Sequence, residues 1–332
     1  MSNNSLAIVA LTTNGAMKHH LDGWRNISSL SDKKDRITLY DISSVKNKER
    51  SSIVHFFSKW SFLYNIINDK KNKYFFFING EYNPMLTLFL LLLRVRRKKV
   101  FITWHDVIHH PGSLSNLLYW LISFVNVGLA SGLIVHNTKY LTFNWLKKIN
   151  QVLGYSSLPV PEYFYPREGE VLSNKSNTIL FFGRIEEYKG LRAVVDCLSN
   201  AETLLKLLII GKGDKTLIKY IKNKANHKNI EYKDVFLKEE ELALLIKKSK
   251  GVLMPYSQCS QSIVPDIVSS FGVPLIVSRQ VEDAMSVVRN NNAIEFKDCN
   301  DLIGLFNNES LANTKFNFNA KSKLAVIDLI MT

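Results

Sequence analysis

Two cations follow a short apolar run in the second half of the chain, at a spacing that suits phosphate binding. The run Ile179–Phe182 is typical of a buried strand, and Gly183 after it permits a tight turn. Arg184 comes next and Lys189 follows five residues later. Arg can hold phosphate oxygens through two parallel N–H bonds, and Lys supplies a compact charge. The alternative is a surface ion pair of Arg184 with a glutamate at residues 186–187.

A second polar stretch lies between another apolar run and a helix expected to begin near Ser262. Residues Ser260, Gln261 and Ser262 follow the run Val252–Met254. Serine is a favoured N-cap residue, and the free N–H groups of a helix start attract phosphate. The sequence therefore predicts that these three residues bind phosphate, with a capped helix that holds no ligand as the alternative.

Short apolar runs alternate with longer helical stretches along the whole chain. Runs that are apolar on both faces and separated by helices indicate parallel sheets covered on both sides. The expected strands are Leu6–Leu11, Ile37–Tyr40, Tyr74–Ile78, Val100–Thr103, Leu133–His136, Thr178–Phe182, Leu205–Ile210, Val252–Met254, Pro274–Val277 and Ala293–Glu295. The pattern predicts an α/β protein with two doubly wound domains.

A proline-rich segment interrupts this alternation. The stretch Leu158–Pro161 disfavours both helix and strand, which places a linker there. We expect a Rossmann-like domain over residues 1–165, a second over residues 166–312, and a C-terminal tail or helix over residues 313–332 that packs back on the first domain. Ligands of such sheets bind at the carboxyl ends of the strands, so we expect a crevice where the two domains face each other.

Three segments in sequence resemble the GT-B glycosyltransferases, specifically the retaining family four. They are Gly183–Gly190, Ile209–Asp214 and Met254–Pro274. The resemblance implies two facing Rossmann-like domains and a nucleotide diphosphate sugar as donor. It also implies that Arg184 and Lys189 contact the donor diphosphate in place of a divalent metal. We therefore expect no metal and no cofactor besides the donor substrate.

The chain departs from this family at one pair of positions. The family usually carries two glutamates eight residues apart, the later one binding the donor ribose, where this chain has Cys259 and Ile267. Asp266 is adjacent and could take over the ribose contact. The departure keeps open an alternative function, a non-catalytic GT-B partner subunit of a glycosyltransferase complex.

The first half of the chain supplies candidates for the sugar and the acceptor side. Gly15 follows the first expected strand and resembles the family's glycine loop, and His105 resembles a histidine that hydrogen-bonds the transferred sugar. Asp106 beside it is a further substrate-binding candidate. A metal site of His105, Asp106 and residues 109–110 is the alternative, but Pro and Gly at residues 111–112 end the segment and no further ligand is evident.

The net charge of +14, from 43 Lys and Arg against 29 Asp and Glu, favours anionic partners. No nucleic-acid recognition motif is present, so we expect none of that class. The leucine run Leu86–Leu93 is too short to span a bilayer, which needs about 20 residues. It precedes five cations within residues 94–99, so we expect peripheral contact with an anionic membrane surface. A core helix with cations at its C-terminus is the alternative.

Three cysteines, at residues 197, 259 and 299, are odd in number and far apart. This pattern predicts no disulfide framework and favours a reducing, cytoplasmic location. The start of the chain reads as a buried strand rather than a signal peptide. The resemblance to family four implies, together with these observations, a cytoplasmic enzyme that moves a hexosyl unit from a nucleotide diphosphate sugar to a saccharide or lipid-linked saccharide, with retention, which we expect to act in cell-envelope polysaccharide synthesis.

Overall fold

The computed structural model describes most of the chain and divides it into two compact units. The described residues are 4–11, 16–41, 61–62, 64–79, 83–105, 116–136, 140–141, 143–144, 152–155, 160–164, 176–225, 229–257, 259, 262–284, 293–308, 311 and 320–331. Unit 1 comprises Met1–Pro161 with Asn319–Thr332, and unit 2 comprises Glu162–Phe318. The C-terminal segment is thus grouped with the first unit, and the division falls at residue 161 rather than 165.

Unit 1 is built on a parallel sheet of six strands in the order β2-β1-β3-β4-β5-β6. The strands are β1 (Leu6–Ala10), β2 (Ile37–Asp41), β3 (Tyr74–Phe77), β4 (Lys99–Trp104), β5 (Gly132–Val135) and β6 (Val152–Tyr155). Neighbouring strands pair in parallel throughout. All carboxyl ends of the strands therefore lie at one edge of the sheet and all amino ends at the other.

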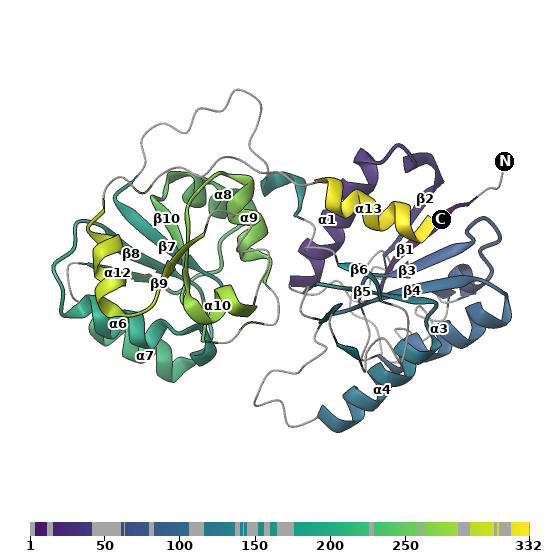
Figure 1. Cartoon of the computed structure of the whole chain (residues 1–332), viewed down its shortest axis with the longest axis horizontal. Helices are drawn as coiled ribbons and strands as arrows, with labels where there is room; N and C mark the ends of the chain where they lie inside the picture. Colours follow the sequence, from purple (N-terminus) through teal and green to yellow (C-terminus); the bar gives the residue numbers. More distant parts are fainter. Residues whose placement is uncertain are drawn as a thin grey trace. The chain divides into compact units, whose positions relative to one another are not determined.

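Helices cover both faces of this sheet (Figure 1). Alternate residues of each strand point to opposite faces, so one strand supplies two separate cores. On one face, side chains such as Ile8 and Phe76 pack with α1 (Ala16–Leu30) and α13 (Ala320–Met331). On the other, side chains such as Val9 and Phe77 pack with α3 (Pro84–Val95) and α4 (Asn116–Leu129). A short 3-10 turn, η1 (Lys34–Arg36), precedes β2.

Unit 2 repeats this design with a second parallel sheet, in the order β12-β11-β10-β7-β8-β9. Its strands are β7 (Thr178–Phe182), β8 (Lys206–Ile210), β9 (Ile230–Lys233), β10 (Gly251–Met254), β11 (Leu275–Ser278) and β12 (Ile294–Phe296). Its helices are α6 (Leu191–Ser199), α7 (Lys215–Lys224), α8 (Glu239–Lys248), α9 (Val264–Ser270), α10 (Arg279–Ala284) and α12 (Cys299–Phe306), with 3-10 turns η4 (Glu162–Phe164) and η5 (Glu187–Lys189). Two doubly wound units confirm the predicted fold class.

The strands that the sequence missed lie at the edges of the sheets. Each of the ten expected strands is present within one or two residues at either end, whereas β6 and β9 were not expected. In β9, only Ile230 is buried and its neighbours carry charges. An edge strand pairs on one side only and is half solvated, so it lacks the apolar run that marks a central strand.

A disulfide corrects the interpretation of the cysteines. Cys197 in α6 and Cys299 in α12 form a disulfide, with their Cα atoms 5.7 Å apart. The two helices pack against each other although the cysteines are 102 residues apart in sequence. Spacing along the chain could not reveal this proximity because it arises from the packing of the folded unit.

The described helices include none that is both long enough and apolar enough to cross a membrane. The leucine run is the interior of α3, where Leu86, Phe89, Leu90 and Leu93 are buried in the core of unit 1. Asn83 caps the helix by accepting a 2.9 Å hydrogen bond from the backbone N–H of Met85.

Candidate functional site

The backbone at the end of β7 makes room for a lysine ammonium. Gly183 has a φ of +119°, a conformation that side-chain-bearing residues rarely adopt. A Cβ atom placed there would lie 3.3 Å from Nζ of Lys189. The glycine therefore lets the strand turn and leaves the space beside its Cα to the ammonium group.

The η5 turn that carries Lys189 packs tightly on the loop after β10. Gly190 ends this turn with a φ of +69°, and a Cβ atom there would lie 1.9 Å from the carbonyl oxygen of Pro255. The backbone N–H and the hydroxyl of Ser257 both donate to the carbonyl of Tyr188, at 2.8 and 3.0 Å. Two of the segments that the sequence singled out are thus in direct contact.

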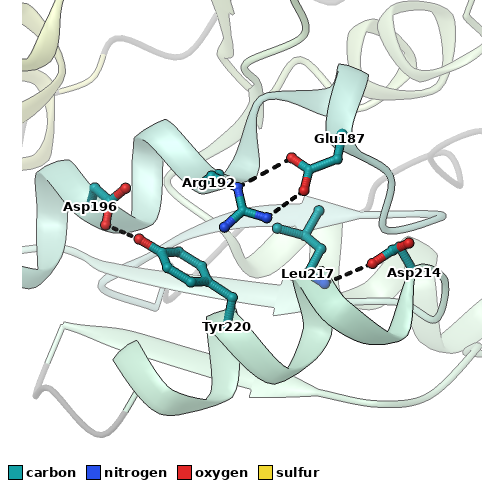
Figure 2. Close-up of polar contacts among 6 residues, drawn as sticks. All are labelled: Glu187, Arg192, Asp196, Asp214, Leu217 and Tyr220. Atoms are coloured by element: carbon teal, nitrogen blue, oxygen red, sulfur yellow. Dashed lines mark hydrogen bonds and ion pairs between the residues drawn. The ribbon is translucent and has the colours of Figure 1, made fainter.

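A polar network connects the η5 turn to helices α6 and α7 (Figure 2). Arg192 of α6 binds both carboxylate oxygens of Glu187, and its guanidinium lies 4.5 Å from the ring centre of Tyr220. The Tyr220 hydroxyl donates to Asp196. Asp214 caps α7 by accepting a 2.7 Å bond from that helix's first turn. These contacts couple η5, α6 and α7 into one support.

Lys189 is a buried cation with an unusual environment. Only 8% of the residue is exposed, and its ammonium donates to the Tyr256 hydroxyl at 3.0 Å. The ammonium also lies 4.7 Å from the centre of the Tyr256 ring. Burial, assisted by the nearby Arg184 guanidinium, lowers the pKa of Lys189 to about 8. No carboxylate within the described residues forms an ion pair with it.

Arg184 is the exposed counterpart of this buried lysine. Its side chain is 69% exposed, and its Nη1 atom lies 3.1 Å from Oε1 of Glu186. The surface ion pair considered as the alternative is therefore present. An exposed pair of this kind is worth at most about 1 kcal/mol, so a phosphate can displace the carboxylate from Arg184.

Tyr256 links Lys189 to the second polar stretch. Its ring is buried, which raises the pKa of its hydroxyl, and that hydroxyl hydrogen-bonds the Ser262 side chain. Ser262 in turn accepts a 3.2 Å bond from the backbone N–H of Val264. Helix α9 begins at Val264 with Ile263 as its N-cap, so it starts two residues later than expected and Ser262 precedes the cap. Ser260 and Gln261 lie outside the described residues.

The two positions that lack the expected glutamates differ in their surroundings. Cys259 is partly buried and close enough to the ammonium of Lys189 to influence its pKa. Ile267 is buried in α9, and Asp266 beside it is only 9% exposed. The position of the first glutamate thus adjoins the cation site, and the position of the second is filled by an apolar side chain.

In unit 1, His105 lies at the carboxyl end of β4 within a cluster of three imidazoles. His20 of α1 and His136 at the end of β5 are the other two, and the ring centres lie 5.0 to 5.5 Å apart. All three residues are buried. Neither His20 nor His136 could be recognised as a site residue from the sequence, because only the fold brings α1 beside the ends of β4 and β5. Gly15, Asp106 and residues 109–110 lie outside the described residues.

One nitrogen of each of these histidines lies within 4.8 Å of the other two, close enough to share a metal ion. The Trp24 indole N–H, however, donates to Nε2 of His20 at 3.1 Å. That bond requires a bare Nε2, so the proton of neutral His20 is on Nδ1. Burial, with the neighbouring His105 and His136, lowers the pKa of His20 well below its usual value. In this tautomer, His20 offers its neighbours an N–H donor rather than a metal ligand.

Two doubly wound units, the second with a cation pair at the end of its first strand, define the GT-B fold class. A family model described as glycosyl transferases group 1 matches residues 166–307, which lie within unit 2. That match supports the recognition of a GT-B glycosyltransferase made from the sequence. No curated protein matched the chain.

Solved structures of this fold match both units at low sequence identity. The lipopolysaccharide outer core galactosyltransferase WaaB matches with a TM-score of 0.53 and 13% identity, over 98% of this chain and 97% of that one. HepE from Anabaena, in complex with UDP and glucose, gives 0.62 and 10% over 98% and 97%. Sucrose-phosphate synthase from Thermosynechococcus elongatus gives 0.62 and 12% over 99% and 96%. At these identities, the likeness establishes the fold.

Proposed function

We propose that this protein transfers a hexosyl unit from a nucleotide diphosphate sugar to a hydroxyl of a saccharide or lipid-linked saccharide, in cell-envelope polysaccharide synthesis. The observation that carries the proposal is the buried ammonium of Lys189 beside Gly183 and the exposed guanidinium of Arg184. HepE, a structure of the same fold, is described in complex with UDP-glucose. That description supports a nucleotide sugar as the donor class.

The proposed role of the two cations follows from where charge develops. When the bond between sugar and diphosphate breaks, negative charge accumulates on the departing diphosphate, and fixed donors aimed at it lower the barrier. Lys189 is desolvated in the free protein, so an anion beside it gains more than it would in water. Arg184 exchanges the Glu186 carboxylate for phosphate oxygens. The pair would serve in place of a divalent metal.

We further propose retention at the anomeric carbon, on the strength of the resemblance to family four. We assign no carboxylate the role of nucleophile, because Asp266, the carboxylate among the described candidate residues, is buried in α9. A donor phosphate oxygen would therefore accept the proton of the attacking hydroxyl on the same face of the sugar. We propose that the diphosphate and the ribose are held by Gly183, Ser260, Gln261, Ser262 and Asp266.

The imidazole cluster of unit 1 is the proposed contact for the transferred sugar. His105 would hydrogen-bond a sugar hydroxyl, and His20 and His136 would help to orient the sugar. The buried His20 Nδ1 atom has no hydrogen-bond partner among the described residues. A sugar hydroxyl can accept from such a donor. Gly15 and Asp106 remain proposed substrate-binding residues of the same unit.

Membrane contact is proposed through helices α3 and α4. Helix α3 buries Leu86, Leu90 and Leu93 in the core but leaves Leu91 and Val95 exposed. Helix α4, which packs beside α3, also exposes Leu118, Leu121 and Val125, which lie on one face at helical spacing. Cations of residues 94–99 follow at the end of α3. Flotation with anionic liposomes tests this contact, and equal recovery with neutral liposomes would remove it.

A thermal-shift screen with UDP, GDP and their sugar conjugates tests the donor class, followed by mass spectrometry of donor hydrolysis. We expect one base to raise the melting temperature and its sugar conjugate to be hydrolysed slowly without an acceptor. Stabilisation without any hydrolysis or transfer would favour the non-catalytic partner subunit, for which the buried Ile267 at a glutamate position is the motivating observation. No response to any nucleotide would overturn the proposal.

A further inference from the structure

Unit 1 has a strongly basic hollow at the edge of its sheet opposite to the carboxyl ends of the strands. The hollow has a volume of about 590 Å³ and is lined by residues that directly precede β1, β2, β3 and β4. This volume lies within the ~300–1,000 Å³ typical of small-molecule sites. Because all strands are parallel, their starts share one edge, and the imidazole cluster lies at the other.

Seven cations and one carboxylate line this hollow. The cations are Arg36 of η1, the three lysines within residues 70–73, and residues 96–98 at the end of α3; the carboxylate is Asp35. None of the seven forms an ion pair with a carboxylate in the described part of the chain. Elsewhere, exposed cations such as Arg25 and Lys33 are paired. The like charges of the hollow are thus concentrated and not neutralised.

Three of the cations of the hollow are positioned by neutral oxygens. Lys98 donates to the backbone carbonyls of Asp69 and Asn72, and Arg96 donates to the side-chain oxygen of Asn68 at 3.1 Å. Lys73 lies 3.4 Å from the side-chain oxygen of Asn4. Such bonds hold the cations in place but leave their charge available to an anion.

The nearby carboxylate of Asp69 is already occupied. It accepts hydrogen bonds from the Tyr40 hydroxyl, the Asn72 side chain, and the backbone N–H groups of Lys71 and Asn72. Burial opposes its ionisation, but these bonds outweigh burial and lower the pKa of Asp69. Asp69 therefore organises the 70–73 loop and does not pair with the cations.

Arg97 supplies an independent sign of a binding role. It has a φ of +56°, the only positive φ of a non-glycine residue among those described. The N–H of Lys98 bonds the Leu93 carbonyl and that of Arg97 bonds the Arg94 carbonyl, so α3 ends in a Schellman motif whose left-handed position usually holds glycine. An arginine there keeps a strained backbone, and strain of this kind gathers at functional sites.

We propose that this hollow binds a ligand that carries two or more phosphate groups close together. Arginine and lysine side chains converging from three loops match such a group in charge, and Arg36, Arg96 and Arg97 can each hold phosphate oxygens with two N–H bonds. The ligand is either a soluble polyphosphorylated molecule or the headgroup of an anionic lipid. The site is separate from the donor site proposed in unit 2.

Calorimetry with inorganic pyrophosphate tests this site, in an Arg184→Ala/Lys189→Ala background that removes the proposed donor-phosphate site. We expect binding in that background, weakened about tenfold by Arg97→Gly (~1.4 kcal/mol). Arg97→Gly should melt at the same or a higher temperature, since glycine accepts the left-handed backbone. Arg25→Gln removes one exposed charge of the same unit elsewhere, and should leave the affinity unchanged. Because this background lacks both donor-site cations, absence of pyrophosphate binding would count against the hollow and leave the proposed transferase activity unaffected. Absence of transferase activity in the wild type would likewise leave the proposed site in the hollow unaffected.

Sedimentation with cardiolipin and phosphatidylcholine vesicles separates the two sources, because the cardiolipin headgroup carries two phosphates. Binding to cardiolipin vesicles alone that pyrophosphate reverses and Arg97→Gly weakens supports a lipid headgroup. Pyrophosphate binding without vesicle binding supports a soluble ligand. The proposal is overturned if neither probe binds, or if Arg97→Gly and Arg25→Gln affect binding equally.

Discussion

The ammonium of Lys189 donates to the hydroxyl of Tyr256 at 3.0 Å in a place where the lysine is almost completely buried. A phenol oxygen is a neutral acceptor, so it satisfies one N–H group without cancelling the charge. The free protein therefore holds a desolvated cation whose pKa is about 8. A group of this kind costs stability in the free protein and strengthens the binding of an anion.

Replacing Lys189 by Met should stabilise the free protein while it abolishes nucleotide binding. In the unfolded chain the lysine titrates near its ordinary pKa of 10.5, and in the folded protein near 8. Below pH 8, both states are charged and the folded one bears the whole burial cost. Between pH 8 and 10.5, the unfolded state binds more protons, so wild-type stability rises with pH.

Urea unfolding of wild type and Lys189→Met across pH 7 to 10.5 measures this difference. The advantage of the variant should be constant below pH 8 and shrink toward zero near pH 10.5. Lys206→Met, at the exposed start of β8, is the matched control and should show no such trend. A constant difference at every pH would show that the lysine is not desolvated.

Removing either proposed diphosphate cation should impair catalysis without unfolding unit 2. A charge-assisted hydrogen bond of ~1.5–3 kcal/mol corresponds to at least tenfold in rate. We therefore expect Arg184→Ala and Lys189→Ala each to reduce turnover at least tenfold, measured as release of the nucleotide diphosphate, with near-native circular dichroism. Wild-type turnover in either variant would withdraw that residue from the diphosphate contact.

The sequence predicted the central strands of both sheets because each is a short apolar run, buried on both faces. The apolar run at Phe75 and Phe77 identifies a strand in any context. The edge strand that begins at Ile230 cannot be identified in this way, because its exposed charged residues resemble those of a loop. The C-terminal helix α13 packs against α1, which joins two segments from opposite ends of the chain.

The residues of the candidate site also fall into two groups, those that the sequence identified and those that only the fold brings together. Gly183, Arg184 and Lys189 are close in sequence, so their motif could be recognised from residue types alone. Tyr256 is 67 residues from Lys189, and only the contact between η5 and the loop after β10 makes it a partner. His20 and His136 join His105 through three separate elements. Local motifs therefore identified the cations, whereas the groups that contact Lys189 and His105 required the fold.

Replacing His105 by Ala should damage the handling of the sugar rather than that of the nucleotide. Loss of one hydrogen bond to a sugar hydroxyl costs ~0.5–1.5 kcal/mol, or up to about tenfold. We expect kcat/KM for the nucleotide sugar to fall by about that factor. The affinity for the free nucleotide diphosphate, measured by calorimetry, should remain unchanged. Equal losses for both ligands would show that His105 acts on the fold instead.

Acid should destabilise unit 1 through His20. Its pKa in the folded protein is well below the ordinary 6.5, because burial and the two neighbouring imidazoles oppose a charge there. Below pH 6.5, the unfolded chain binds the proton first, so stability falls as the pH falls. His20→Gln should flatten the dependence of the free energy of unfolding between pH 7 and 5. If wild type and variant show the same slope, His20 is not the group that titrates.

Reduction of the disulfide should destabilise unit 2. Cys197 and Cys299 close a loop of about a hundred residues, and removing such a link typically costs ~2–5 kcal/mol because the unfolded chain gains freedom. We expect dithiothreitol to lower the melting temperature of wild type and of Cys259→Ser, the control that leaves the disulfide intact. Cys197→Ser/Cys299→Ser should already melt at the lower temperature and not respond.

Thiol titration after denaturation without reductant should give one reactive group, because only Cys259 lies outside the disulfide. Three reactive thiols would show that α6 and α12 are held by packing alone.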